Sequence, residues 1–358
     1  MHLPSTRASR ALSSAILAAS VLLAAPASAY AATSLDSSSD APAGATAKGH
    51  KVHYPTREAR AAGAAVSRNT LRYGGGVDGI GVTVGTPKVY LIFWGTQWGT
   101  QGTAADGSLT FSADASGAAP YLQRLFKGVG TNGERWSNVM AQYCEGVAAR
   151  ATTCPASAPH VGYPTGGALA GVWYDNASAM PSSATDHQLA VEAVAAATHF
   201  GNTTPAQNRS VQYVVLSATG THPGGFGTAA ANWCAWHDWN GDTTLVGGAA
   251  SSTVGDIAFT NMPYVLDLGA SCGKGYVNGA AGALDGFSIV EGHEYAETIT
   301  DQNPAGGWTS SNGSENADLC AWKGVGGLGG AGNLATATGS FPMQGTWSNL
   351  DNGCRLVR

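Results

Sequence analysis

Charged residues are scarce in this 358-residue chain: Asp, Glu, Lys and Arg make up 11% of it, against roughly 25% in an average soluble domain. Only six residues are lysines, so the chain lacks the basic face of a nucleic-acid-binding protein. A disordered chain is also excluded, because 44% of the residues are hydrophobic and ten are tryptophans, enough to build a substantial core. We therefore expect a folded protein that does not bind nucleic acid.

No hydrophobic run reaches the ~20 residues needed to span a membrane. The apolar run from Ala15 to Ala25 follows Arg7 and Arg10 and precedes the small residues Ala27-Ser28-Ala29-Tyr30-Ala31, which is the order found in a secretory signal peptide. The sequence predicts that residues 1–31 are such a peptide, cleaved after Ala29 or Ala31. The mature protein is then expected to be extracellular and free of the membrane.

Large apolar residues are rare from Thr33 to Arg72, where Ser, Ala and Gly dominate. Such a segment cannot bury enough surface to offset the entropy lost on ordering. We predict a disordered spacer over residues 32–72, with a short propeptide as the alternative. The folded domain is expected over residues 73–358.

The chain has six cysteines and no CxxC pair, so disulfide bonds are expected rather than a cysteine-based zinc site. Six cysteines can pair in many ways. Their order along the chain favours pairing between neighbours. This predicts three bonds: Cys144 with Cys154, Cys234 with Cys272, and Cys320 with Cys354.

Strands and helices are indicated by the hydrophobic pattern. Continuous β-branched and aromatic runs predict buried strands over Pro87–Trp94 and Val211–Leu216, and a third strand is expected over Ile257–Val265. Helices are predicted over Ala119–Phe126 and Asp186–Phe200. Because the elements alternate without a strict βαβ repeat, we expect an α+β domain with a mixed sheet.

No GxSxG motif is present, which argues against a serine hydrolase. Three tryptophans spaced by three, with His237 among them, are either an aromatic platform for substrate or part of the core. Their closeness to Cys234 favours the core. The three are Trp233, Trp236 and Trp239.

Acidic residues are unevenly distributed: seven of the 23 lie between Asp285 and Asp318, and no Lys or Arg lies among them. An even spread would place about two there. Carboxylates this dense repel one another, so a bound cation is the simplest explanation. A solvated acidic surface is the alternative, but apolar residues such as Phe287 and Ile289 are interleaved with the acids, as in a core.

A helix is predicted in this stretch, because Ser288 to Glu291 has the form of a capping box and Asn303-Pro304 would stop the helix. His293 and Glu297 are four positions apart and can bind one metal ion, while Glu294 reaches a water on that ion. The pattern His-Glu-x-x-Glu is expected only about 0.005 times by chance in a chain of this composition. An ordinary salt-bridged pair is the alternative.

A third metal ligand is expected from Glu315 or Asp318, which follow Glu297 by 18 and 21 residues. We favour Glu315 as the ligand and Asp318 as a partner of His293, or the two roles exchanged. Asp301 shares the helix face of His293 and is the remaining candidate.

The segment from His293 to Glu297 resembles the HExxH motif of the zincin metallopeptidases, with Glu297 replacing the second histidine. Glu315 and Asp318 resemble the downstream residues of the glutamate-ligand branch of that group. The resemblance implies a zincin-like fold, a metal held by His293, Glu297 and Glu315 on and near an active-site helix, and Glu294 as general base. Zinc is the expected ion, with manganese, iron and calcium as alternatives.

A looser similarity, to the phosphate-induced, EXORDIUM-type secreted proteins, extends over most of the chain from Val89. It is carried by Leu284-Asp285-Gly286, Asn303-Pro304 and Asp318-Leu319-Cys320, and it implies an extracellular protein.

Taken together, these features predict a secreted, monomeric, metal-dependent endopeptidase that acts on proteins or peptides. The alternative is a non-catalytic extracellular protein that binds cell wall or polysaccharide and holds a structural cation.

Overall fold

The computed structural model describes residues 53–62, 70–229 and 231–358, all of which belong to one compact unit. The predicted signal peptide, residues 1–31, lies outside the described residues. None of the helices in the described part combines the length and apolar character that a membrane crossing requires.

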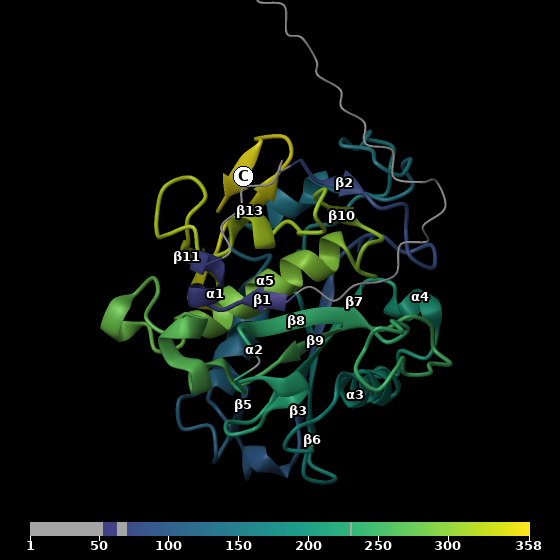
Figure 1. Cartoon of the computed structure of the whole chain (residues 1–358). Coiled ribbons are helices and arrows are strands. Elements are labelled where there is room, and N and C mark those ends of the chain that lie inside the picture. The colour runs from purple at the N-terminus through teal and green to yellow at the C-terminus, as the bar shows by residue number, and fades with distance from the viewer. Residues whose placement is uncertain (1–52, 63–69, 230) are drawn as a thin grey trace, which may run out of the picture. The chain divides into compact units, whose positions relative to one another are not determined.

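The main sheet is mixed, as predicted, and its six strands lie in the order β1-β8-β9-β7-β3-β6 (Figure 1). Strands β9, β7, β3 and β6 run parallel, β8 is antiparallel to β9, and β1 is antiparallel to β8. The strands are β1 (His53–Pro55), β3 (Lys88–Trp94), β6 (Leu169–Asp175), β7 (Val211–Ser217), β8 (Trp233–Trp239) and β9 (Ala258–Met262).

Shorter elements surround this sheet. Four two-stranded antiparallel pairs are β2 (Arg72–Tyr73) with β10 (Trp308–Thr309), β4 (Gln101–Thr103) with β5 (Leu109–Phe111), β11 (Gly332–Thr336) with β12 (Gly339–Met343), and β13 (Thr346–Ser348) with β14 (Gly353–Arg355). The α-helices are α1 (Arg57–Ala62), α2 (Ala118–Gly128), α3 (Asp186–His199), α4 (Pro205–Asn208) and α5 (Asp285–Thr300). The 3₁₀ turns are η1 (Thr96–Trp98), η2 (Ser137–Gln142), η3 (Pro223–Gly225), η4 (Val265–Cys272), η5 (Gly279–Ala281) and η6 (Asp318–Cys320).

The strands and helices predicted from periodicity are present. Strands β3 and β7 and helices α2 and α3 match their predicted ranges closely, while β9 ends three residues before the predicted Val265. Strands β6 and β8 were not predicted.

Strand β7 shows which helices cover which face of the sheet, because neighbouring side chains on a strand point to opposite sides. Gln212 donates a hydrogen bond to Thr298 of α5 (3.0 Å), whereas the hydroxyl of Tyr213 donates to Asn208 of α4 (2.6 Å). Helix α3 also packs on β7. Helix α5 therefore covers one face of the sheet, and α4 lies on the other.

Helix α5 is buried along its whole length, but it does not begin as predicted. It starts at Asp285, so Ser288 and Glu291 lie inside the helix and the capping-box prediction is wrong. The hydroxyl of Ser288 instead donates to the carbonyl of Pro342 in β12 (2.6 Å). The Ser288 hydroxyl is therefore used in a hydrogen bond to a strand and not to cap the helix.

All three predicted disulfide bonds are confirmed: Cys144–Cys154, Cys234–Cys272 and Cys320–Cys354. They are consistent with an extracellular protein. Cys234 lies in β8 and Cys320 in η6, so two of the bonds anchor these elements to distant parts of the chain.

Within the predicted spacer, residues 53–62 form β1 and α1, Leu71 is buried in the core, and Arg72 lies in β2. Tyr54 pairs with Ala235 of β8 and is fully buried. The prediction of a disordered spacer therefore does not hold for these residues, because strand pairing and the burial of Tyr54 compensate for the scarcity of other large side chains. Residues 32–52 and 63–69 of the predicted spacer lie outside the described part of the chain.

Glu192 of α3 is a buried carboxyl group that should make stability depend on pH. Burial, together with the charge of Asp175 and a hydrogen bond to it, raises the pKa of Glu192 from 4.5 to about 8. The folded protein then binds this proton more tightly than the unfolded chain does. The stabilising effect of the proton on Glu192 is complete below about pH 4.5 and is lost as the pH rises to about 8.

We expect Glu192→Gln, which keeps a donor for Asp175, to be more stable than the wild type by a few kcal/mol at pH 9 and equally stable at pH 4. Chemical denaturation at both pH values measures this difference, with Glu58→Gln at an exposed position of α1 as the control. The same gain at both pH values would contradict the assignment.

Candidate metal centre

Three parts of the chain bring two histidines and four carboxylates together. Helix α5 and strand β8 supply most of them, and the remainder come from the start of η6 and the turn that leads into it. We call this set the six-residue cluster. It is buried, and only Asp318 has any exposed surface, 6%. Its members are His237, His293, Glu294, Glu297, Glu315 and Asp318.

His293, Glu297 and Asp318 form the first group in the cluster. Nε2 of His293 lies 2.9 Å from Oε1 of Glu297 and 3.7 Å from Oδ1 of Asp318. Two ligands of one tetrahedral zinc ion are about 3.4 Å apart, since each lies about 2.1 Å from the ion. These separations therefore fit ligands that share a cation.

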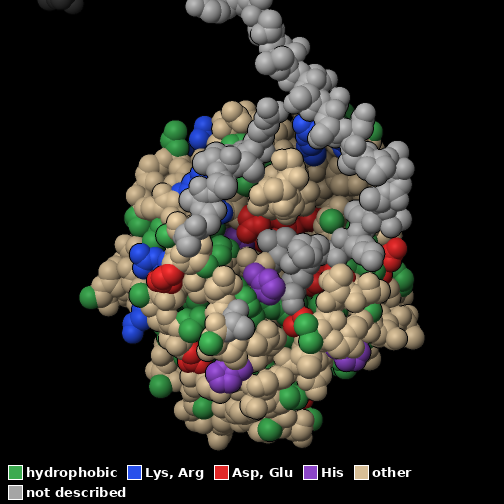
Figure 2. Space-filling view, in the orientation of Figure 1, with side chains coloured by type: hydrophobic (Ala, Val, Ile, Leu, Met, Phe, Trp, Pro, Cys, Tyr) green, Lys and Arg blue, Asp and Glu red, His purple; other side chains and the backbone are tan. Residues whose placement is uncertain are grey.

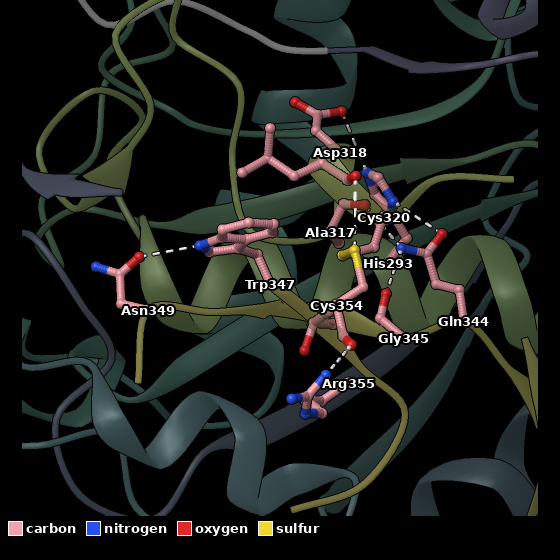
Figure 3. Close-up of a disulfide and its surroundings, with 12 residues drawn as sticks. His293, Ala317, Asp318, Cys320, Gln344, Gly345, Trp347, Asn349, Cys354 and Arg355 are labelled. Carbon is pink, nitrogen blue, oxygen red and sulfur yellow. Dashed lines mark hydrogen bonds and ion pairs between the residues drawn. A yellow bond between two sulfur atoms is a disulfide. The ribbon is translucent and has the colours of Figure 1, made fainter. Parts of the chain in front are cut away.

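Gln344 orients the imidazole of His293. Figure 3 shows His293 with Asp318 on one side of the ring and Gln344 on the other. The amide nitrogen of Gln344 donates to the carbonyls of Ala317 (2.8 Å) and Gly345 (3.2 Å), so its oxygen faces Nδ1 of His293, 3.3 Å away. Nδ1 must then carry the proton, which leaves the lone pair of Nε2 directed at the carboxylates, as a metal ligand requires.

His237 stands at the centre of a second set of contacts. Its Nε2 atom lies 2.9 Å from Oε2 of Glu315 and 3.8 Å from Oε2 of Glu297. The tryptophans beside it in β8 are buried in the core, as favoured from the sequence, and form no exposed platform: Trp233 (5% exposed), Trp236 (0%) and Trp239 (8%). Sequence reasoning did not identify His237 as a ligand.

Glu294 has two buried carboxylate oxygens without a hydrogen-bond partner among the described residues. One of its oxygens lies within 4.8 Å of both a ring nitrogen of His237 and an oxygen of Glu297. It is therefore close enough to act on a molecule held at the cluster, and no hydrogen bond to the described residues engages its oxygens.

Burial dominates the electrostatics of the cluster. It lowers the pKa of both His237 and His293 to about 4, so that both rings are neutral near pH 7 and able to bind a metal. Burial also raises the pKa of every carboxyl group in the cluster, and for Glu294 and Glu315 the negative charge of Glu297 is the next largest cause.

Compensation by basic side chains is limited: burial raises the pKa of Asp318, and the charge of Arg60 offsets only part of that rise. Within the described part of the chain, no Lys or Arg forms an ion pair with a member of the cluster. Figure 2 shows that Lys and Arg are also sparse on the face of the molecule that it presents. Protons or a bound cation must therefore balance the charge of the cluster.

The structure separates the three candidates for the third ligand. Asp318 lies beside His293, whereas Glu315 lies beside His237 and not in the role of a His293 partner that either form of the predicted assignment gave to one of the two. Asp301 belongs to neither metal-binding group, and its carboxylate accepts hydrogen bonds from the backbone N–H groups of Ala305 and Gly307. Asp301 thus shapes the turn after α5.

Tyr54 of β1 covers the cluster at His293. The two ring centroids are 3.9 Å apart, with 26° between the ring planes. Trp322 stacks on Tyr54 at 5.1 Å, and its indole N–H donates to the carbonyl of Pro55 (2.8 Å). The N-terminal strand therefore helps to close the cluster to solvent.

Comparison with known proteins identifies no relative: no family model matches the chain, and no curated protein or solved structure is significantly similar to it. The resemblances to zincins and to EXORDIUM-type proteins thus rest on the sequence motifs alone.

Proposed function

We propose that the chain is a secreted, metal-dependent endopeptidase with a zincin-like fold. The observation that carries the proposal is the buried contact of His293 with Glu297 and Asp318, with unpartnered Glu294 on the same helix. His293, Glu297 and Asp318 would hold a divalent ion, with zinc expected and calcium as an alternative. The mixed sheet beneath α5 supports a zincin-like arrangement.

The chain's own residues supply binding, orientation and proton transfer. A bound divalent ion would polarise the scissile carbonyl and favour ionisation of water. Glu294 takes a proton from the attacking water and delivers it to the leaving amine. Gln344 keeps the Nε2 lone pair of His293 directed into the site, and the burial of the cluster strengthens each electrostatic contact.

The proposal is tested by incubating the purified chain with a mixture of unstructured peptides and analysing the products by mass spectrometry. We expect internal peptide bonds to be cleaved, cleavage to stop when a zinc chelator is added, and activity to return with added Zn²⁺. A metal-loaded protein that cleaves none of the peptides would contradict the proposal.

The closed environment of the cluster favours a second candidate, a non-catalytic extracellular binding protein with a structural cation. Five of the six cluster residues have no exposed surface. A peptidase of this structure requires movement of Tyr54 and β1 before a substrate can reach the site. Because the tryptophans of β8 are buried, a polysaccharide would have to contact other residues.

Tyr54→Ala tests whether β1 controls access to the cluster. The substitution removes a buried ring from the strand, so the strand should detach more often. We expect a zinc chelator to remove the metal at least about tenfold faster, since a loss of about 1.4 kcal/mol in docking suffices for that change. The control is Tyr90→Ala, which removes a ring stacked on Tyr213 instead. Equal rates in wild type and Tyr54→Ala would exclude β1 as the cover.

A further inference from the structure

We propose that the six-residue cluster binds two divalent cations, with the carboxylate of Glu297 as the bridge between them. The first position is formed by His293, Asp318 and Oε1 of Glu297. The second is formed by His237, Glu315 and Oε2 of Glu297. This inference rests on the metal centre of the proposed function and not on its peptidase activity.

The two oxygens of Glu297 are the first reason for two positions. Oε1 lies 2.9 Å from Nε2 of His293, and Oε2 lies 3.8 Å from Nε2 of His237. Each imidazole thus faces a different oxygen of the same carboxylate. Pairs of metal ions in enzymes are typically about 3.5–4 Å apart, a separation that one bridging carboxylate can span.

The grouping of the ligand atoms also indicates two positions, although the second group contains Glu294 where the proposal places Glu315. Among the described residues, the possible ligand atoms that lie within 4.8 Å of one another form two groups of three residues, and Glu297 is common to both. One group contains His293 and Asp318, and the other contains His237 and Glu294. The 2.9 Å contact of Glu315 with His237 adds a further carboxylate to the second group.

The second position is held as firmly as the first. His237 lies in β8, three residues after Cys234, whose disulfide bond to Cys272 anchors the strand. Asp318 lies two residues before Cys320, which is bonded to Cys354. Both imidazoles also project from elements of the core. The ligands are therefore preorganised on rigid elements, as a specific metal site requires.

The stoichiometry of metal binding tests the inference. The full chain is stripped of metal, equilibrated with excess Zn²⁺, desalted and analysed by elemental mass spectrometry. We expect two zinc ions per wild-type chain and one per chain in His237→Asn. The control His187→Asn changes a histidine whose Nδ1 contacts the carbonyl of Gly248, away from the cluster, and should retain two ions.

A parallel experiment with Mn²⁺ reports on the bridge. Two Mn²⁺ ions joined by a carboxylate should give a spin-coupled electron paramagnetic resonance spectrum in the wild type, and His237→Asn should give the six-line spectrum of an isolated ion.

Saturation of the wild type at one zinc ion per chain would overturn the inference without affecting the peptidase proposal. Two ions in His237→Asn would overturn it as well. Because the wild-type stoichiometry requires no variant, misfolding of His237→Asn does not prevent the test.

Discussion

Glu294→Gln should lower peptide hydrolysis by about 10²–10⁴-fold, the usual effect of losing a general base. Both carboxylate oxygens of Glu294 are buried and lack hydrogen-bond partners among the described residues, so an amide of the same size breaks no hydrogen bond to them. Glutamine cannot accept the proton of the attacking water. Metal content and melting temperature should therefore remain close to those of the wild type.

Glu291→Gln is the matched control for this experiment. Glu291 lies three residues earlier on α5, is equally buried and also has two oxygens without hydrogen-bond partners, but it belongs to neither metal-binding group. We expect it to retain hydrolysis within a few-fold of the wild type. Unchanged hydrolysis in Glu294→Gln would reject Glu294 as the base, and loss of metal in that variant would identify Glu294 as a ligand.

The parts of the fold that follow from local sequence were predictable. Strands β3 and β7 are continuous apolar runs, and such runs are typical of strands buried on both faces. The contact between His293 and Glu297 was predictable because α-helix geometry alone brings residues four positions apart onto one face. Neighbouring cysteines pair because the intervening segments return to the same part of the core.

Strand β8 was missed because its tryptophans are spaced by three, which obscures the alternation of a strand. In the structure Ala235 and His237 share one face of β8, and Tyr54 pairs opposite Ala235. Every residue of β8 is buried, so its sequence carries no alternation of apolar and polar residues that would predict a strand. Without the strand, no sequence pattern brings His237 to α5, since the contact joins residues that are distant along the chain.

The roles of Glu315 and Asp318 also depended on tertiary structure. The two residues are three positions apart in one turn, and either could reach α5. The backbone N–H of Asp318 donates to Oε1 of Glu297 (2.8 Å), which places Asp318 beside His293. Gln344 gave no local signal at all, because it contacts His293 from 51 residues away.

Metal removal should destabilise the protein strongly at pH 8 and weakly at pH 5. A ligand present at about 1,000 times its Kd stabilises the folded state by about 4 kcal/mol. At about 2–4 °C per kcal/mol, chelation should therefore lower Tm by about 10 °C at pH 8. Differential scanning calorimetry of loaded and chelator-treated protein measures the shift at each pH.

The sign of this pH dependence follows from the carboxyl groups. Burial and mutual repulsion raise the pKa of Glu294, Glu297 and Glu315 well above their ordinary value, so the metal-free fold retains protons that the unfolded chain has lost. The contribution of these carboxyl groups to stability is largest at low pH and falls as the pH rises through the raised pKa values. A bound cation replaces these protons and binds more tightly as they leave.

The variant His293→Ala lacks one metal ligand, so chelation should lower its Tm by less than it lowers the Tm of the wild type. An equal Tm shift at pH 5 and pH 8 in the wild type would show that the ion lies away from these carboxylates.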